Sequence, residues 1–187
     1  VTFKYGILVN TKRDDFNASA FPGGLLRVNQ GALDKLASPE ELAGILAHEI
    51  AHVERRHGIR SEVQLLIAAP LVSILLAADA GPQALLNSAV ELGASRHSRE
   101  DEFEADRLGM QRLLAVGIDP DAMIEEFTKN RGHAKRSVWS SHPHWMERVQ
   151  QLRRIAHGAR GPFTPIALGT TWNEVADNPA LDTAGFT

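Results

Sequence analysis

The sequence contains no cysteine in its 187 residues. This absence excludes a disulfide framework, a thiolate metal site and a cysteine nucleophile. Any metal ion that the chain binds must therefore be held by histidine, carboxylate or carbonyl groups. The absence does not identify the compartment, because a chain without cysteine suits an oxidising periplasm as well as a reducing cytosol.

A surplus of positive charge is also lacking, since the formal net charge is -3. Nucleic acid is therefore not an expected partner, because binding it requires basic side chains that neutralise phosphates. No signal peptide is recognisable at the N-terminus, which is consistent with removal of a leader or upstream segment.

Long apolar runs are scarce as well. The longest, Leu65 to Ala78, is broken by Pro70 and is shorter than the roughly 20 residues that a membrane-spanning helix needs. No integral membrane span is expected in this chain. We expect one or two buried helices here; the alternative is a membrane-contacting or re-entrant segment.

The composition is that of a globular domain, with 43% hydrophobic and 23% charged residues. Near the N-terminus, two β-rich runs predict strands at residues 3–9 and 25–29, joined by a polar loop and a Pro-Gly-Gly turn. From residue 38 onward the apolar spacing becomes helical. Further helices are predicted at 60–78, 83–94, 98–116, 120–130 and 143–157.

These elements predict an α+β fold that is mostly helical with a small N-terminal sheet. We expect one domain in residues 1–158. Apolar periodicity fades after Gly158, so residues 159–187 are expected to form a tail that packs on the domain or is loosely ordered. The strand at 25–29 is expected at an edge of the sheet, where an extended substrate could pair with it.

One helix start is signalled by several residues together. Ser38 can cap the helix, Pro39 suits its first position, and Glu41 completes a capping box. The helix is expected to run to a stop near Gly58. It therefore contains the most informative motif of the chain, residues 48–52.

That motif reads His48-Glu49-Ile50-Ala51-His52. Residues four apart lie on one face of a helix, about 6 Å apart at Cβ, so two imidazoles can bind one metal ion. Glu49 stands beside the first ligand and can reach a metal-bound water. The alternative is a chance match, but buried imidazoles without a metal would still need polar partners.

A third protein ligand is required for catalytic zinc, with a fourth position left open. Glu102 and Asp106 are also four apart on a predicted helix. One carboxylate can bind zinc while the other accepts the N–H of a ligand histidine and fixes its tautomer. Spacing alone leaves Glu102 open between a ligand and a member of a solvated acidic face. The solvated face is the preferred interpretation for Glu100, Asp101 and Glu104.

These residues resemble a known family. The HEIAH helix and the later E-x-x-A-D pattern of residues 102–106 are similar to the HtpX/BepA-like gluzincin metallopeptidases, which include the CAAX prenyl proteases. Asn17-Ala18 with residues 21–24 resembles the family's segment before the site, and His142-Pro143 with Arg148 resembles the His-Pro segment of the soluble BepA-like branch. The resemblance spans roughly residues 5–156. Ser19 departs from it, because the family often has an aromatic residue there.

The resemblance implies a zincin-like (gluzincin) fold and one zinc ion per chain at His48, His52 and Glu102. It implies Glu49 as general base and Asp106 as the support of a ligand histidine. These roles are expectations that the structure must meet.

The His-Pro histidine of the BepA-like branch implies a second catalytic role, for His142. It would be a displaceable fourth ligand that holds the enzyme latent, or a donor to the oxyanion. Arg148 and Asn17 are candidates for substrate or oxyanion support, although a salt bridge that anchors the last helix is the preferred interpretation of Arg148. His144 is the one rival to His142. The other histidines, at 57, 97, 133 and 157, are expected at the surface or at helix ends.

The function implied is that of a zinc metalloendopeptidase that cleaves protein or peptide substrates, in protein quality control. The resemblance suggests a bacterial periplasm or association with a membrane. The alternative function is a zinc-containing, chaperone-like or assembly factor whose peptidase activity is latent. Metal-dependent hydrolysis of a small molecule is disfavoured by the resemblance alone.

Overall fold

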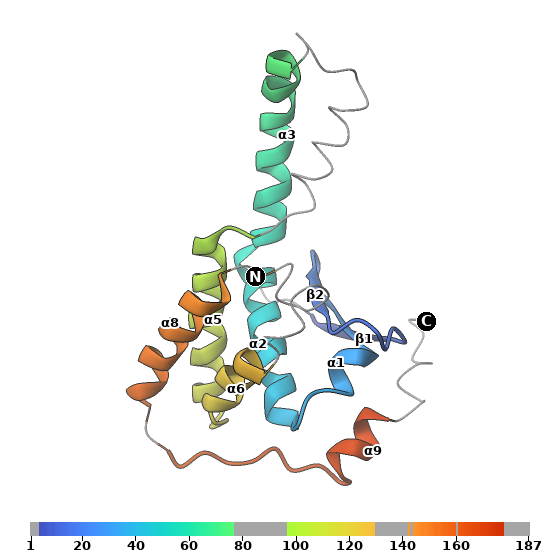
Figure 1. Ribbon diagram of the computed structural model, residues 1–187, viewed down its shortest axis with the longest axis vertical. Helices are drawn as coiled ribbons and strands as arrows, with labels where there is room; N and C mark the ends of the chain where they lie inside the picture. Colours follow the sequence, from blue (N-terminus) through green and yellow to red (C-terminus); the bar gives the residue numbers. More distant parts are fainter. Residues whose placement is uncertain (1–3, 77–96, 130–141, 143, 160, 178–187) are drawn as a thin grey trace.

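The computed structural model describes residues 4–76, 97–129, 142, 144–159 and 161–177. The helix predicted at 83–94 lies outside the described residues, as does His133. A small sheet occupies one side of the molecule and a group of helices the other, while one long helix extends away from both (Figure 1). The predicted α+β class, mostly helical with a small N-terminal sheet, is confirmed.

The sheet has three strands, β1 (Gly6–Asn10), β2 (Ala18–Phe21) and β3 (Leu25–Asn29), in the order β1-β3-β2. β1 runs parallel to β3 and β2 runs antiparallel to it. The turn between β2 and β3 requires Gly24, whose φ is +98° and whose missing Cβ would lie 2.3 Å from the Lys4 carbonyl oxygen. The prediction that Leu25–Asn29 is an edge strand is wrong, because the unpredicted strand β2 pairs with its free side.

Helix α2 (Pro39–Arg55) begins at the predicted cap. The Ser38 Oγ accepts from the Glu41 backbone N–H at 3.3 Å, and a Glu41 carboxylate oxygen accepts from the Ala37 N–H at 2.7 Å. The helix ends earlier than expected, because Arg56 adopts the left-handed conformation with φ 55°. Its first half covers the sheet and α1 (Gln30–Leu33) through a core of small and branched side chains: Phe16, Ala18, Val28, Ala32, Leu33, Leu36 and Ile45.

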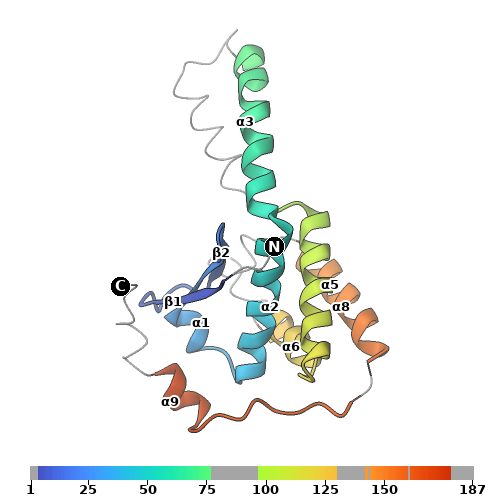
Figure 2. The same ribbon diagram turned by 180° about the vertical axis from the view of Figure 1, so that it is seen from behind.

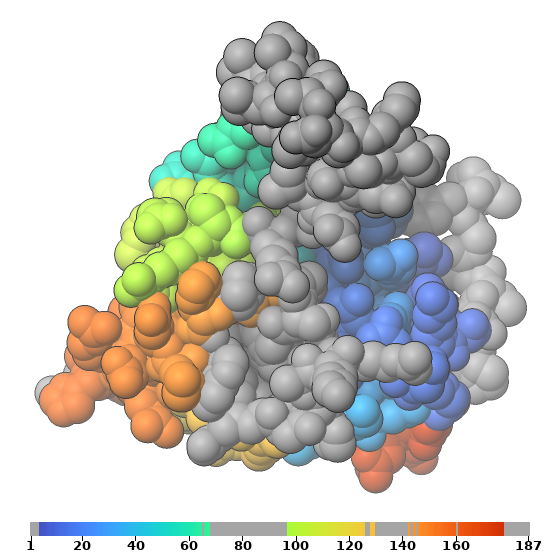
Figure 3. Space-filling model, turned by 45° about the horizontal axis from the view of Figure 1, so that its top comes forward, coloured from blue at the N-terminus to red at the C-terminus, as the bar shows by residue number. Residues whose placement is uncertain are grey.

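Helix α2 also packs on α5 (Arg99–Ala115) and α6 (Asp121–Lys129), and α8 (Trp145–His157) packs on both of these helices. α5 and α8 lie side by side (Figures 2 and 3). α5 approaches α2 closely at Gly109, where a Cβ would lie 3.2 Å from the His48 backbone nitrogen. A Cβ at this position would be tight against the α2 backbone, and the close approach brings the acidic residues of α5 within reach of the histidines of α2.

Helix α3 (His57–Leu76) projects away from the rest of the molecule in both ribbon views (Figures 1 and 2). The prediction that the apolar stretch from Leu65 is buried is wrong for Leu66 and Ile67, which are 72% and 66% exposed; Val63, just before the stretch, is 48% exposed. None of the helices in the described ranges is long and apolar enough to cross a membrane. Leu66 and Ile67 follow Val63 by three and four residues, so these exposed apolar side chains lie on one face of the helix.

The described part of the tail, residues 161–177, runs from the helical side of the molecule back to the sheet side (Figure 1). The Thr164 N–H donates to the Gly117 carbonyl oxygen at 2.8 Å. The tail ends in a short helix, α9 (Trp172–Ala176), which the apolar pattern did not predict. The Trp172 indole donates to the Leu36 carbonyl oxygen at 2.7 Å, and Ala176 joins the sheet-side core.

Candidate metal centre

Four side chains from three parts of the chain meet in the interior between α2, α5 and the start of α8. They are His48, His52, Glu102 and His142, and one donor atom of each lies within 4.8 Å of the others. None is more than 3% exposed. The Nε2 atoms of His48 and His52 are 2.9 Å apart, and the nearest Glu102 oxygen lies 3.5 Å from each of them.

His142 closes the remaining side of this cluster. Its Nδ1 lies 2.9 Å from a Glu102 oxygen and 3.3 Å from His48 Nε2, while its Nε2 lies 3.4 Å from the Glu49 carboxylate. His144, the rival candidate, is an exposed residue that begins α8 with φ 67°. The structure thus brings His142, and not His144, to the cluster.

Electrostatics give His52 and Glu102 the charge states that suit a metal site. Burial first, and then the neighbouring histidines, hold the pKa of His52 well below its ordinary value. Its imidazole is therefore neutral, which is the form that binds a metal ion. Burial opposes ionisation of Glu102, but His142 and Arg148 outweigh it and hold the pKa of that carboxyl far below its usual range.

Asp106 lies directly behind His48. Its Oδ1 is 2.9 Å from His48 Nδ1, on the side of the ring away from the cluster. An ionised carboxylate there can only accept, so His48 carries its proton on Nδ1 and turns the lone pair of Nε2 into the cluster. Burial raises the pKa of Asp106, but Arg148 and His48 together lower it below its ordinary value.

Arg148 connects these groups. Its guanidinium is fully buried and donates to both oxygens of Asp106, from Nε and Nη2, at 2.7 Å each. Its Nη1 lies 2.6 Å from Glu102 Oε2 and donates to the His142 carbonyl oxygen at 3.1 Å. Removing one member of such a buried pair typically costs about 3–5 kcal/mol, because the other charge is left uncompensated.

The surroundings of the Glu49 carboxylate indicate whether this cluster suits a metal ion. Its side chain is 2% exposed, and its buried Oε1 lies 3.4 Å from His142 Nε2 but makes no hydrogen bond within the described residues. A buried carboxylate oxygen without a partner is costly in a folded protein. The two imidazole nitrogens and the carboxylate of the cluster fit a divalent metal ion, and water at that ion would give Glu49 its partner.

Two histidines near the cluster were expected at the surface or at helix ends. His57 is the first residue of α3, but its exposed fraction is 0%, so the surface interpretation is wrong for it. The His97 ring stacks on His52 with centroids 3.9 Å apart, and burial, followed by His142, lowers the pKa of His97 to about 4. Neither residue lies three or four positions from His48 or His52, so the sequence pattern did not place them beside the cluster.

Asn17 lies in the segment before β2. Its backbone oxygen accepts from the Asn29 N–H at 2.8 Å, and its side-chain oxygen is buried without a hydrogen-bond partner among the described residues. Among those residues, none of its hydrogen bonds leads to the four-residue cluster.

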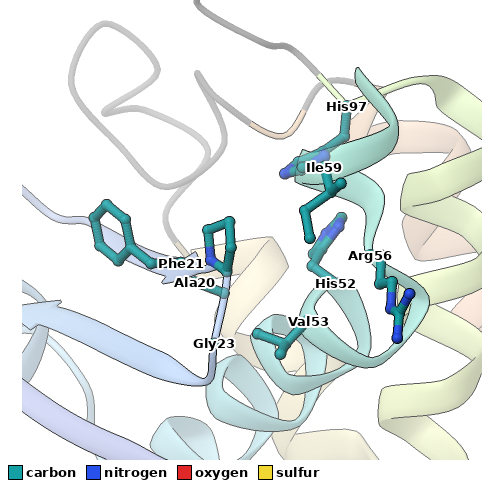
Figure 4. A pocket seen from close by; sticks show the side chains of 10 residues that line it. Ala20, Phe21, Gly23, His52, Val53, Arg56, Ile59 and His97 are labelled. Carbon is teal, nitrogen blue, oxygen red and sulfur yellow. The ribbon is translucent and has the colours of Figure 1, made fainter. Parts of the chain in front are cut away.

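A pocket of about 50 Å³ adjoins the cluster. Figure 4 shows His52, Ile59 and His97 on one side of it, with Ala20 and Phe21 of the edge strand β2 on the other. The pocket wall is mostly apolar. It therefore lies where a polypeptide paired with β2 could place a side chain.

Comparison with known proteins identifies the family. A family model described as Peptidase family M48 matches residues 3–156. The chain belongs to peptidase family M48. The match covers the sheet, the HEIAH helix, α5 and nearly all of α8.

Curated relatives of this M48 chain include three bacterial proteases. It is 32% identical to the beta-barrel assembly-enhancing protease of Escherichia coli over 79% of its own length and 34% of the relative's. The protein of the same name from Yersinia pestis is 38% identical over 62% of this chain and 26% of its own. Metalloprotease YcaL of Escherichia coli is 30% identical over 77% of this chain and 60% of its own length. The chain thus spans about a quarter to a third of the length of the first two relatives.

The contact between Asp106 and His48 generates a prediction for metal binding. Wild type should contain about one metal ion per chain, and Asp106→Ala should bind it about 10–100-fold more weakly, because the His48 ring loses the acceptor that orients it. Elemental analysis and titration against a chelator measure both quantities. Glu100→Ala, an exposed carboxylate on the same helix, is the matched control. Unchanged affinity in Asp106→Ala would show that the contact does not support the metal.

Proposed function

We propose that this M48 chain is a zinc-dependent endopeptidase that holds one zinc ion through His48, His52 and Glu102. The observation that carries the proposal is the buried cluster with the carboxylate of Glu49 beside it, whose Oε1 has no hydrogen bond within the described residues. Structural zinc sites need no general base. A carboxylate placed next to three converging ligands therefore favours a catalytic site.

The chemistry follows from where these side chains lie. Zinc, when bound, supplies a Lewis acid that polarises the scissile carbonyl and makes water a better nucleophile. Glu49 takes a proton from the attacking water and passes it to the nitrogen of the leaving amine. Asp106 holds the His48 ring in place, and burial of the cluster keeps bulk water away from the proton transfer.

The substrate class proposed is protein or peptide chains in an extended conformation. β2 is an edge strand beside the pocket at His52, and an extended segment can add to such an edge through backbone hydrogen bonds. Two relatives are named for enhancing beta-barrel assembly. That similarity supports a role for this chain in protein quality control.

Arg148 and Asn17 receive different proposed roles. Arg148 is buried and engaged by Asp106, Glu102 and the His142 carbonyl, so we propose that it orients these groups and does not touch the substrate. Asn17 precedes the edge strand directly, where its amide would support the backbone of a bound substrate.

The alternative function is a chaperone-like or assembly factor in which the same centre is latent. The specific observation in its favour is His142, whose Nδ1 lies among the metal-binding atoms and whose Nε2 faces Glu49. In this position the imidazole fills the coordination site that a substrate and water require. We propose that His142 is a latch that must move away before cleavage.

A membrane surface is the further partner proposed. Val63, Leu66 and Ile67 form an exposed apolar row on α3, and an apolar helix face of this kind can enter the interface of a bilayer. Together with the similarity to the beta-barrel assembly-enhancing proteases of two bacteria, this row supports a location in the periplasm or at a membrane.

Glu49→Gln separates the peptidase from the non-cleaving alternative. The variant keeps the shape of the side chain but cannot accept a proton, so it should bind zinc normally and cleave an unfolded protein substrate about 10²-fold more slowly or worse. The control is Glu62→Gln, an exposed glutamate of α3, which should cleave normally. Near-normal cleavage by zinc-loaded Glu49→Gln would refute the role of general base. A wild type that binds zinc but does not cleave would favour the assembly factor.

His142→Ala distinguishes a latch from an oxyanion donor. Removing a latch should raise the basal rate of cleavage while zinc is retained, because the coordination site is opened. Removing an oxyanion donor should instead lower the rate by about 10²–10³. Rates are measured on zinc-loaded protein of confirmed stoichiometry, with His144→Ala as the control for the neighbouring imidazole. A fall in rate would contradict the latch.

The apolar row on α3 predicts binding to lipid vesicles. Wild type should co-sediment with vesicles of phosphatidylethanolamine and phosphatidylglycerol, and Leu66→Glu should lower the partitioning by about tenfold or more, since burying one such side chain contributes roughly 1.5–3 kcal/mol. Glu62→Gln on the same helix serves as control. Equal partitioning of Leu66→Glu and wild type would exclude contact through this row.

A further inference from the structure

His57 is a fully buried imidazole that the proposed chemistry leaves unused. It begins α3, directly after the left-handed residue Arg56 that ends α2. It lies outside the set of four residues that could hold the metal. Its position places it between His52 and two carboxylates of α5.

The contacts of His57 form a chain of polar groups. Its Nδ1 lies 2.8 Å from His52 Nδ1. Its Nε2 lies 3.1 Å from Glu104 Oε2 and 3.3 Å from Asp101 Oδ1. His52 turns its other nitrogen, Nε2, into the metal-binding cluster.

Hydrogen bonding along this chain selects one tautomer for each ring. Ionised carboxylates only accept, so His57 donates from Nε2 to Glu104, with the Asp101 carboxylate close to the same nitrogen. A neutral His57 then has a lone pair on Nδ1, and it accepts the proton of His52 Nδ1. His52 is left with its lone pair on Nε2, directed at the metal. The reverse arrangement would place a proton on His52 Nε2, where the metal must bind.

His48 provides an internal comparison. Its Nδ1 is held by the Asp106 carboxylate at 2.9 Å, so both ligand imidazoles have a partner on the side away from the cluster. For His48 the partner is a carboxylate of α5, and for His52 it is an imidazole that is itself held by carboxylates of α5. Outer partners of this kind orient a ligand ring and raise its affinity for metal.

The carboxylates behind His57 are held in place by arginines. Arg55 donates to Glu104, from Nε at 2.7 Å, and Arg60 Nη2 lies 3.4 Å from Asp101. These contacts keep negative charge at the outer end of the chain of groups. The acidic residues that looked like a solvated face therefore have a structural partner in the interior.

We propose that His57 is a positioning residue that fixes the tautomer and orientation of the metal ligand His52, with Glu104 and Asp101 as its own supports. The inference rests on the proposed zinc site. It assigns to two carboxylates of α5 a role that neither the motif nor the family resemblance suggested.

Zinc affinity tests the proposal without reference to catalysis. Titration against a chelator of known affinity compares wild type with His57→Leu, which has no acceptor, and with His57→Asn, whose side-chain oxygen can accept from His52. His57→Leu should bind zinc about 10–100-fold more weakly, and His57→Asn should recover most of that loss. Leu36→Ala, in the core on the sheet side, should be destabilised with unchanged zinc affinity, which separates positioning from stability.

Nitrogen-15 NMR of zinc-loaded wild type supplies a readout that needs no variant. The imidazole of His57 should carry its proton on Nε2, and that of His52 on Nδ1. Wild-type zinc affinity in His57→Leu, or a proton on Nδ1 of His57, would overturn the proposal. A wild type that binds no zinc would instead contradict the proposed function, so the two failures are distinguishable.

Discussion

The buried ion pair between Asp106 and Arg148 is the interaction on which the centre depends. Asp106 orients His48, while Arg148 reaches Glu102 and the carbonyl of His142. One pair thereby links α2, α5, α8 and the segment before α8. Charges without solvent contact are tolerated only when they are mutually compensated, so each of these residues restricts where the others can lie.

Close packing of α5 on α2 makes that network possible. At Gly109 the two backbones approach as closely as a missing Cβ allows, and apolar side chains from α2, α5, α6 and α8 fill the space beside it. The carboxylates of α5 then reach both histidines of the cluster: Asp106 contacts His48 directly, and Glu104 and Asp101 contact His57, which contacts His52. The candidate metal site thus lies on one helix pair and is closed on its last side by His142.

Two further parts of the molecule lie near this helix pair: the sheet with its pocket, and the projecting helix α3. β2 and its pocket lie beside His52, and the described tail ties the helices back to the sheet core through Trp172 and Ala176. α3 carries its exposed apolar row away from both. A polypeptide that pairs with β2 would approach His52 from the sheet side and leave that row free for another surface.

Local spacing was enough to predict the helix at Ser38 and the facing pair His48 and His52, because caps and i, i+4 contacts depend only on nearby residues. The HEIAH and E-x-x-A-D motifs were enough to indicate the family. The four-residue strand β2 was missed, which placed Leu25–Asn29 wrongly at the edge. Burial of His57 and the contacts of Arg148 depend on how α5 packs against α2 and α8 against α5, and exposure of α3 depends on its projecting away from the other helices. Those contacts join residues as far as 100 positions apart, and a pattern of neighbouring residues carries no signal for them.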